Sequence, residues 1–150
     1  MKTTAAVAMD EETVNRLRNA VMRIGRRLRT ASADEGLTTT QSGVLATLVR
    51  GGPMRAGDLA EAEAINPTLL SRVLGHLEEA GLVDRGPDPE DARCTRVSAT
   101  PAGVLLLGRL RARRAALLAT GLEGLAPDRL AALREALPAL EDLAGEGEPH

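Results

Sequence analysis

The stretch Arg55–Arg85 restricts the possible folds of this 150-residue chain more than any other. It predicts a short helix over about 56–62, a tight turn, a longer helix and then a strand. The longer helix has a clear start, because Asn66 can cap it and Pro67 takes the first helical position, where a missing N–H costs nothing. Gly81 ends the helix. The residues predicted to face the core are Leu70, Val73, Leu74 and Leu77.

A β-hairpin is predicted directly after this helix. Its strands are Leu82–Arg85 and Arg93–Ala99, and they are joined by the turn-forming run Gly86–Asp91. A helix presented beside a basic hairpin is an arrangement with which small proteins read one face of a DNA duplex. DNA binding is therefore the first hypothesis for this segment.

Two helices are predicted before this segment. The first covers about Asp10–Thr30, where apolar residues recur at spacings of three and four, and Ala31–Leu37 breaks that pattern. We expect Arg26, Arg27 and Arg29 to suit the C-terminal end of this helix. Thr38 and Gln41 have the spacing of a capping box and open the second helix, which Gly51–Pro53 ends. Its predicted buried residues are Val44, Leu45 and Leu48.

Two more helices are predicted after the hairpin. Thr100 and Pro101 open a long helix that runs to about Thr120, and the last helix covers about Pro127–Leu143. The outer helices carry more leucine than the middle of the chain can cover. This favours pairing with the same helices of a second chain in a two-fold dimer, and a monomeric bundle is the alternative. On the long helix, the predicted apolar side consists of Leu105, Leu106, Leu110, Leu117 and Leu118.

The length is that of one ordinary domain. Hydrophobic residues make up 43% of the chain, yet Phe, Tyr and Trp are absent, so the core must be aliphatic. We expect a single domain over 1–150, with a reading lobe at about 37–100 and dimerisation helices at about 10–30 and 101–143.

Charge argues against binding through a broad positive field. The chain has a net charge of −2, and residues 36–100 hold six Arg against nine Asp plus Glu. Any contact with DNA must therefore come from individually placed arginines. The negative charge also keeps open a second class, a protein–protein adaptor that uses the same surface. A third class is a helical carrier that binds a small molecule in a cavity between its helices.

The sequence predicts a cytoplasmic protein. Its single cysteine, Cys94, rules out an intramolecular disulfide and fits a reducing compartment. Met1–Met9 contains no apolar stretch long enough for a secretory signal. The longest aliphatic run, Val104–Leu107, is far too short to span a membrane, so we expect no membrane partner.

Six short segments form a recognisable pattern: Leu37–Gln41, Asp58–Ala60, Ser71–Val73, Leu77–Arg85, Pro89–Arg93 and Thr100–Gly103. In order and spacing they resemble the MarR-type winged helix-turn-helix regulators, and the resemblance covers roughly 10–143. It implies a mainly α fold with a small β-hairpin, in which a winged helix-turn-helix lobe sits on a helical dimerisation base. It also implies a homodimeric transcription factor, often a repressor, that binds double-stranded DNA at a palindromic operator. A small phenolic or organic-acid effector releases DNA from many relatives.

The chain departs from the family pattern at three places. Ala92 replaces the middle residue of the usual Asp-Arg-Arg in the wing, which removes one possible phosphate contact or ion pair. Glu63 and Ala64 stand where the turn usually carries Leu-Gly, so a positive φ at Ala64 would be strained. Arg55 stands where a Ser or Thr usually opens the first helix of the motif.

Candidate DNA-contacting residues on the longer helix lie opposite its apolar face. Arg72 is the first choice for a bidentate contact to guanine in the major groove; a solvated arginine, or one paired with Glu79, is the alternative. Thr68 and Ser71 can donate to bases or phosphates, or be plain surface hydroxyls. The remaining candidates are Leu69 against a thymine methyl, Asn66 and Pro67 through the backbone N–H groups at the helix start, and His76, which is otherwise a surface residue.

Candidate residues in the wing are Asp91 and Arg93. They lie two apart in a segment expected to be extended, so both side chains should share one face. The resemblance implies that Asp91 braces Arg93, which enters the minor groove; a plain surface ion pair is the alternative. Arg55, Thr95 and Arg96 are further candidates for DNA contacts, and Arg85 is interpreted as a structural brace.

The sequence contains no recognisable enzymatic motif, so no catalytic residue and no cofactor are expected. His76 has no second ligand at metal-binding spacing, and no metal site is predicted. We interpret Cys94 as a small strand residue, not as a redox sensor. The arginines at 109, 111, 113 and 114 are interpreted mainly as the solvated face of a helix, with an anion pocket as the alternative.

Overall fold

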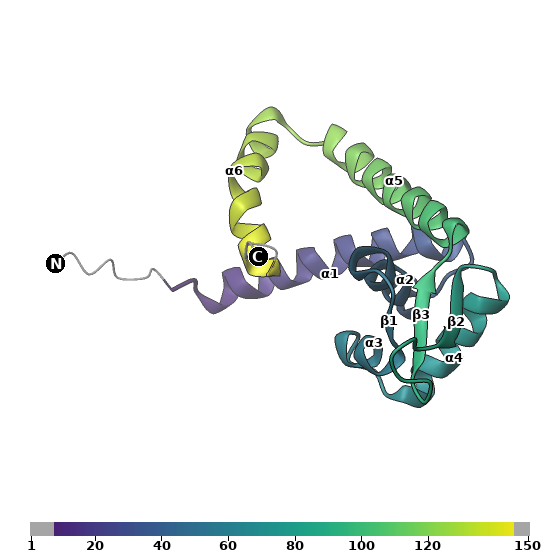
Figure 1. Cartoon of the computed structure of the whole chain (residues 1–150). Helices are drawn as coiled ribbons and strands as arrows, with labels where there is room; N and C mark the ends of the chain where they lie inside the picture. The colour runs from purple at the N-terminus through teal and green to yellow at the C-terminus, as the bar shows by residue number, and fades with distance from the viewer. Residues whose placement is uncertain (1–7, 146–150) are drawn as a thin grey trace. The chain divides into compact units, whose positions relative to one another are not determined.

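The computed structural model describes residues 8–145. Met1–Met9, which we assessed for a secretory signal, lies almost wholly outside this range. The chain forms two compact units, the first ending at Arg114 and the second beginning at Ala115. The helices and strands run in the order α1 Glu11–Asp34, α2 Thr39–Gly51, β1 Met54–Arg55, α3 Ala56–Ala62, α4 Pro67–Glu79, β2 Val83–Pro87, β3 Thr95–Ala99, α5 Pro101–Glu123 and α6 Pro127–Ala144 (Figure 1).

The predicted fold class is confirmed, because six helices accompany one small antiparallel sheet in the described residues. The sheet has three strands in the order β1-β3-β2, where the sequence predicted only a hairpin. Val97 of β3 lies opposite Met54 on one side and Arg85 on the other. The strand β1 was missed because two residues are too short to show a periodicity of two.

The core of the first unit is aliphatic, as the composition requires. Leucines and valines of α2, α3, α4, α5 and the sheet pack into one cluster that contains no aromatic ring. The buried faces predicted for α2 and α4 are confirmed. The largest fully buried side chains are Leu45, Leu48, Leu59, Leu70, Leu74, Leu77, Leu107 and Leu110.

Helix α1 is longer than the sequence predicted. We expected a break at Ala31, but the helix continues to Asp34, and Ala31 and Ser32 are buried. Their small side chains leave room for Arg114 of α5. The guanidinium group of Arg114 donates to both the Ser32 and Ser42 hydroxyls. Arg26, Arg27 and Arg29 consequently lie before the last turn of α1, not in it. The apparent linker residues are therefore packing residues.

Two arginines of α5 also make contacts that the sequence did not predict. Arg113 forms ion pairs with Glu35 at 2.8 Å and Asp34 at 3.5 Å, at the C-terminal end of α1. With the hydroxyl contacts of Arg114, these pairs tie the middle of α5 to α1 and α2. Arg113 and Arg114 therefore hold helices together, although we interpreted them as a solvated face.

The start of α5 is hydrogen-bonded to the short segment between α4 and β2. Thr100 donates its hydroxyl to the Gly81 carbonyl at 2.7 Å and accepts from the Gly103 N–H at 3.1 Å. Its backbone N–H donates to the Leu82 carbonyl at 3.0 Å. A Cβ on Gly103 would lie 2.3 Å from that carbonyl oxygen, so no larger residue fits there without a shift.

Several apolar residues remain exposed in each unit. In α5, Leu105 is 65% exposed, whereas the prediction gave it to the apolar side and left out Leu107, which is buried. In the second unit α6 has no buried residue. No helix within residues 8–145 is long and apolar enough to cross a membrane.

Candidate nucleic-acid interface

Helix α4 begins where the sequence predicted. The Asn66 side chain accepts from the Leu69 N–H at 2.8 Å, and Pro67 occupies the first helical position. The cap satisfies one of the N–H groups that a helix start leaves without an internal partner. Because the buried face of α4 packs into the core, the opposite face is held toward solvent at a fixed angle.

The turn between α3 and α4 carries the strain anticipated from the sequence. Ala64 has a φ of 53°, the only positive φ of a non-glycine residue within 8–145. An Ala in this conformation costs free energy that Gly would not. The turn is nevertheless held, since Ile65 N–H donates to the Ala60 carbonyl at 3.1 Å and the Thr47 hydroxyl donates to the Glu63 carboxylate.

The outer face of α4 consists of exposed side chains. Arg72 makes no ion pair and no hydrogen bond within the described part of the chain, so the alternative pair with Glu79 does not form there. His76 is less free, because its Nδ1 lies 3.4 Å from Nε2 of Gln41 at the start of α2. The exposed candidates on this face are Thr68, Leu69, Ser71, Arg72 and His76, with Asn66 and Pro67 exposed at the helix start.

The loop Asp88–Cys94, called the wing loop below, joins β2 to β3. Asp91 accepts from Arg93 through both carboxylate oxygens, at 3.1 Å from Nε and 3.2 Å from Nη2. The Arg93 N–H donates to the same carboxylate at 3.1 Å. These contacts hold the pKa of Asp91 below its usual range, the Arg93 side chain being the main cause. The Arg93 side chain as a whole nevertheless stays 90% exposed.

The Asp91 and Arg93 side chains meet as predicted, but the predicted reason, an extended segment that puts both on one face, is wrong. Residues 91–94 form a turn, and β3 begins only at Thr95. The Cys94 N–H donates to the Asp91 carbonyl at 2.9 Å, which closes this turn. The pairing thus comes from the side chain of Asp91 capping its own turn, not from alternation along a strand.

Asp88 lies at the base of the wing loop, and the sequence analysis did not select it. Its side chain is 1% exposed and lies 2.7 Å from Nε of Arg55 and 3.7 Å from Nη1 of Arg96. The other carboxylate oxygen accepts from the Glu90 N–H at 2.8 Å. The hydrogen bond from Arg55 is the main cause that holds the pKa of Asp88 below its usual range, and Asp88 in turn raises the pKa of Arg55.

Arg55 and Arg96 are therefore ion-paired at the base of the wing, whereas Arg93 projects from it. Arg96 also donates to the Pro53 carbonyl at 3.3 Å. A sequence pattern could not reveal Asp88, because Pro87-Asp-Pro89 reads as a turn and Arg55 precedes it by 33 residues. The available indication was a carboxylate placed between two prolines.

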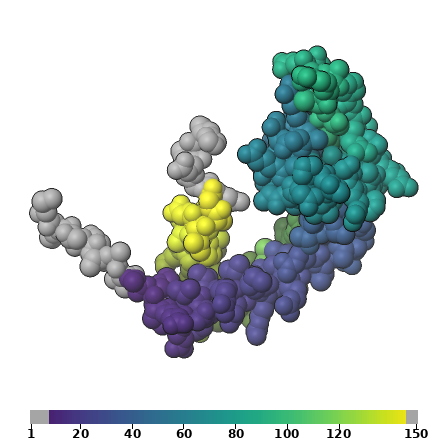
Figure 2. Space-filling view, turned by 90° about the horizontal axis from the view of Figure 1, so that it is seen from below, coloured from purple at the N-terminus to yellow at the C-terminus, as the bar shows by residue number. Residues whose placement is uncertain are grey.

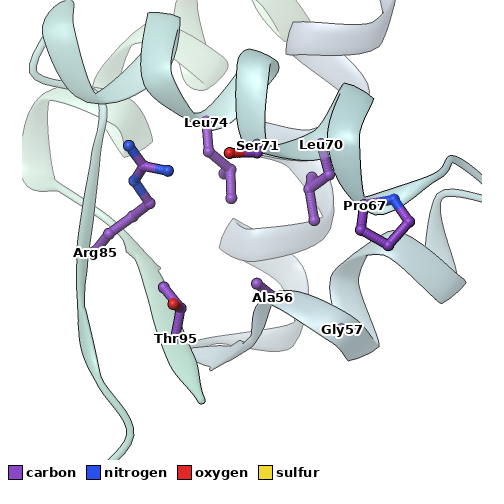
Figure 3. A pocket seen from close by; sticks show the side chains of 8 residues that line it. All are labelled: Ala56, Gly57, Pro67, Leu70, Ser71, Leu74, Arg85 and Thr95. Carbon is purple, nitrogen blue, oxygen red and sulfur yellow. The ribbon is translucent and has the colours of Figure 1, made fainter. Parts of the chain in front are cut away.

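A cavity of about 210 Å³ lies between α4, the start of α3 and the hairpin. Figure 3 shows Ser71 and Leu74 on the α4 side and Thr95 on the hairpin side. Arg85 also lines it, and its guanidinium group pairs with Glu78 at 3.2 and 3.3 Å, which lowers the pKa of Glu78. This pair joins β2 to the end of α4, consistent with the structural role predicted for Arg85.

No cluster of three or more His, Cys, Asp or Glu side chains within residues 8–145 could hold a metal ion. Cys94 is a half-exposed free thiol whose Sγ lies 3.7 Å from Oδ2 of Asp91. The arrangement of α4 and the wing loop therefore offers hydrogen-bond donors and arginines on one lobe. Such groups bind anions and base edges.

Comparison with known proteins agrees with a nucleic-acid interface. The family model described as "MarR family" matches residues 35–93. An HTH-type transcriptional regulator of Mycobacterium leprae, ML2140, is 35% identical over 127 residues, which cover 85% of this chain and 89% of the relative.

Solved structures are similar as well. RV1404 from Mycobacterium tuberculosis has a TM-score of 0.77 and 25% identity, over 96% of this chain and 99% of that one. A mutant of MarR from E. coli, solved in complex with operator DNA, has a TM-score of 0.62 and 23% identity, over 85% of this chain and 93% of that one. At this identity the second likeness concerns the fold.

Proposed function

The chain belongs to the MarR family of transcriptional regulators and is not an enzyme, and from this premise we propose that it acts as a homodimeric repressor. In this proposal it binds a pseudo-palindromic operator whose half-sites lie about one helical turn apart. Each α4 enters a major groove, and each wing loop reaches the flanking minor groove. A small organic acid or phenol releases the DNA.

The observation that carries this proposal is the outer face of α4. Thr68, Ser71 and Arg72 are exposed donors on consecutive turns of a helix that the core holds rigidly. Arg72 has no partner within the described residues and is free to make the bidentate contact that guanine O6 and N7 offer. Leu69 adds an apolar group suited to a thymine methyl.

The wing loop supports the second part of the proposal. Arg93 is exposed, yet its guanidinium group is oriented by the two hydrogen bonds that it donates to Asp91. An oriented arginine can enter a narrow minor groove with little loss of side-chain entropy. The operator DNA in the E. coli structure supports placing a lobe of this fold on a duplex.

Homodimer formation is supported by uncovered aliphatic surface. In α1, Val14, Val21 and Ile24 are about half exposed, and the first turns of α1 form open surface on the face shown in Figure 2. In the second unit, Leu133, Leu137 and Leu143 are also exposed. Burying such faces against a second copy would remove apolar surface from water.

Charge supports the same pairing. Between residues 13 and 33, α1 has six arginines and no acidic residue, whereas α6 has four acidic residues and two arginines. We propose that these helices meet across the dimer. Residues 10–30 and 101–143 would then form the dimerisation base of a single domain, with 37–100 as the reading lobe.

The effector and the location are the remaining parts of the proposal. The cavity beside Ser71 and Arg85 is large enough for a small acid, and occupancy there would disturb α4. A free thiol at Cys94 agrees with the reducing cytoplasm. Titrating the operator complex with benzoate-like and aliphatic acids tests release, and an unchanged dissociation constant would remove the effector from the proposal.

The experiment that tests DNA binding is selection of bound duplexes from a random pool at near-physiological salt. We expect an inverted repeat with about 10 base pairs between half-site centres. Recovery of unrelated sequences would contradict operator binding. Sedimentation of the free protein at the same salt tests the dimer, and a monomer at micromolar concentration would contradict it.

Single substitutions then assign the contacts. Arg72→Ala should cost about 1–3 kcal/mol at one base pair of each half-site and relax the preference there. Arg93→Ala should weaken binding to all sequences and lower the salt dependence by about one phosphate contact. An equal loss on every duplex for Arg72→Ala would assign Arg72 to the phosphates instead.

A further inference from the structure

We propose that Asp88 determines DNA specificity by holding Arg55 and Arg96 away from the phosphates, so that Arg93 is the arginine which the wing loop offers to DNA. This inference rests on the proposed function, since it concerns how the same surface discriminates between duplexes. Asp88 touches no DNA in this proposal and acts through the two arginines as a positioning residue.

The two carboxylate oxygens of Asp88 have different partners. Oδ1 accepts from the backbone N–H groups of Glu90 at 2.8 Å and Asp91 at 3.4 Å, which shapes the start of the wing loop. Oδ2 faces both arginines, at 2.7 Å from Arg55 and 3.7 Å from Arg96. One buried group therefore fixes the loop and holds the two cations.

The ion pairs on the two sides of the wing loop differ in accessibility. Asp88 is buried, and the half-buried Arg55 and Arg96 belong to β1 and β3, so their positions depend on the sheet. Arg93 is paired with Asp91 at the exposed tip of the loop. A phosphate can reach Arg93 without disturbing the fold, but it must compete with a buried carboxylate for Arg55.

The surroundings of the Asp88 cluster leave room for released side chains. The cluster lines a hollow of about 510 Å³ together with Pro53, Met54, Asp58 and Glu90. Released arginines would add contacts to the backbone of any duplex, because phosphates carry no sequence information. On the operator, the base contacts of α4 fix where the lobe sits, whereas on random DNA the lobe can settle where the released arginines reach most phosphates. The added contacts therefore favour random DNA over the operator.

Asp88→Asn separates these roles. The amide oxygen of Asn can still accept from the Glu90 N–H, so the turn remains. The amide NH2 group then lies where Oδ2 accepted from Arg55, and two donors face each other. Arg55 and Arg96 must turn away from it. Glu90→Gln is the matched control. It removes the same charge two residues along the chain, from a side chain that is 89% exposed and reaches Arg55 only at 3.9 Å.

The experiment measures dissociation constants of the dimer for the selected operator and for a random duplex of equal length, between about 50 and 200 mM salt. We expect Asp88→Asn to steepen the salt dependence on random DNA by one to two phosphate contacts, about 0.9 each in log–log slope. The ratio of random to operator dissociation constants should fall about tenfold or more. Glu90→Gln should change both duplexes alike.

Two further variants separate released charge from altered structure. Adding Arg55→Gln and Arg96→Gln to Asp88→Asn should return the slope on random DNA to the wild-type value. If the steeper slope came from an altered loop conformation, removing these two charges would not restore it. Arg96→Gln alone keeps the short Arg55–Asp88 contact and therefore the fold. It should leave the wild-type slope unchanged, and a decrease of about one contact would overturn the inference.

The outcomes distinguish this inference from the proposed function. If the wild-type protein prefers its operator but Asp88→Asn behaves like Glu90→Gln, only the role of Asp88 is overturned. If the wild-type protein binds operator and random duplexes equally, the proposed function fails and takes the inference with it. Hydrogen exchange of the free proteins verifies that Asp88→Asn keeps the core of the lobe.

Discussion

Helix α4 and the wing loop belong to one lobe and contact the same hairpin, but different interactions hold them. The helix is held by four aliphatic side chains in the core and by a cap directly before its first turn. The loop is held by Asp88 and Asp91, whose partners are arginines and N–H groups. The position of α4 therefore depends on core packing, whereas the position of the wing loop depends on charged groups.

The largest effect should come from removing core packing under α4. Leu74 is 2% exposed, and Leu74→Ala should lower the free energy of unfolding by about 2–5 kcal/mol. Leu69→Ala, at a residue 37% exposed on the same helix, is the control and should cost far less. Chemical denaturation measures both. Equal losses would mean that α4 is not held by its buried face.

Loss of the helix cap should have a smaller effect. Asn66→Ala removes the acceptor of the Leu69 N–H and should cost about 0.5–2 kcal/mol. Asn66→Asp keeps an acceptor and adds charge at the positive end of the helix, so the free energy of unfolding should be retained. Thr68→Ala, at the exposed start of the same helix, controls for side-chain removal in the same denaturation experiment. A neutral result for Asn66→Ala would contradict the capping role.

The strained turn before α4 offers a change of opposite sign. Ala64→Gly should raise the free energy of unfolding by about 0.5–1 kcal/mol, because Gly adopts a φ of 53° without a Cβ clash. Ala20→Gly, in the middle of the exposed part of α1, should destabilise instead. Thermal unfolding distinguishes the two, and destabilisation by both would show that the turn holds no strain.

Acid should affect the wing loop before it affects α4, with the smallest effect on overall stability. The folded-state pKa values of Asp88 and Asp91 lie below their usual range. Their contribution is thus complete above about pH 4 and is lost as the pH falls through the folded-state values. Wild type should be more stable than Asp88→Asn near pH 7, and the difference should shrink toward about pH 3.

The control for this titration is Asp84→Asn, at an exposed carboxylate that forms no ion pair within residues 8–145. Its difference from wild type should not follow the same course. A constant gap between wild type and Asp88→Asn across the acid range would mean that Arg55 does not stabilise the Asp88 carboxylate.

The same contrast explains what the sequence could predict. The bounds of α3 and the start of α4 follow from neighbouring residues, since Asn66 and Pro67 act within one helical turn. The capping box of Thr38 and Gln41 is equally local, and both of its hydrogen bonds form. Apolar periodicity identified the buried face of α4 because burial there repeats every three or four residues.

The remaining features depend on residues far apart in the chain. Asp88 meets Arg55 across 33 positions, and Ser32 meets Arg114 across 82. No local pattern connects such pairs. The C-terminal end of α1 was missed for this reason, because Ala31 and Ser32 resemble a linker until their packing is seen. Strand β1 is likewise defined by its partner β3, not by its own two residues.

The junction at Gly103 has a mechanical consequence. Thr100 and Gly103 contact the Gly81 and Leu82 carbonyls so closely that the first turn of α5 and the end of the α4 segment must move as one piece. A rotation of α5 would therefore be transmitted directly to the end of α4, because no flexible side chain lies between the two backbones. Gly103 thus makes this junction a direct contact between two main chains.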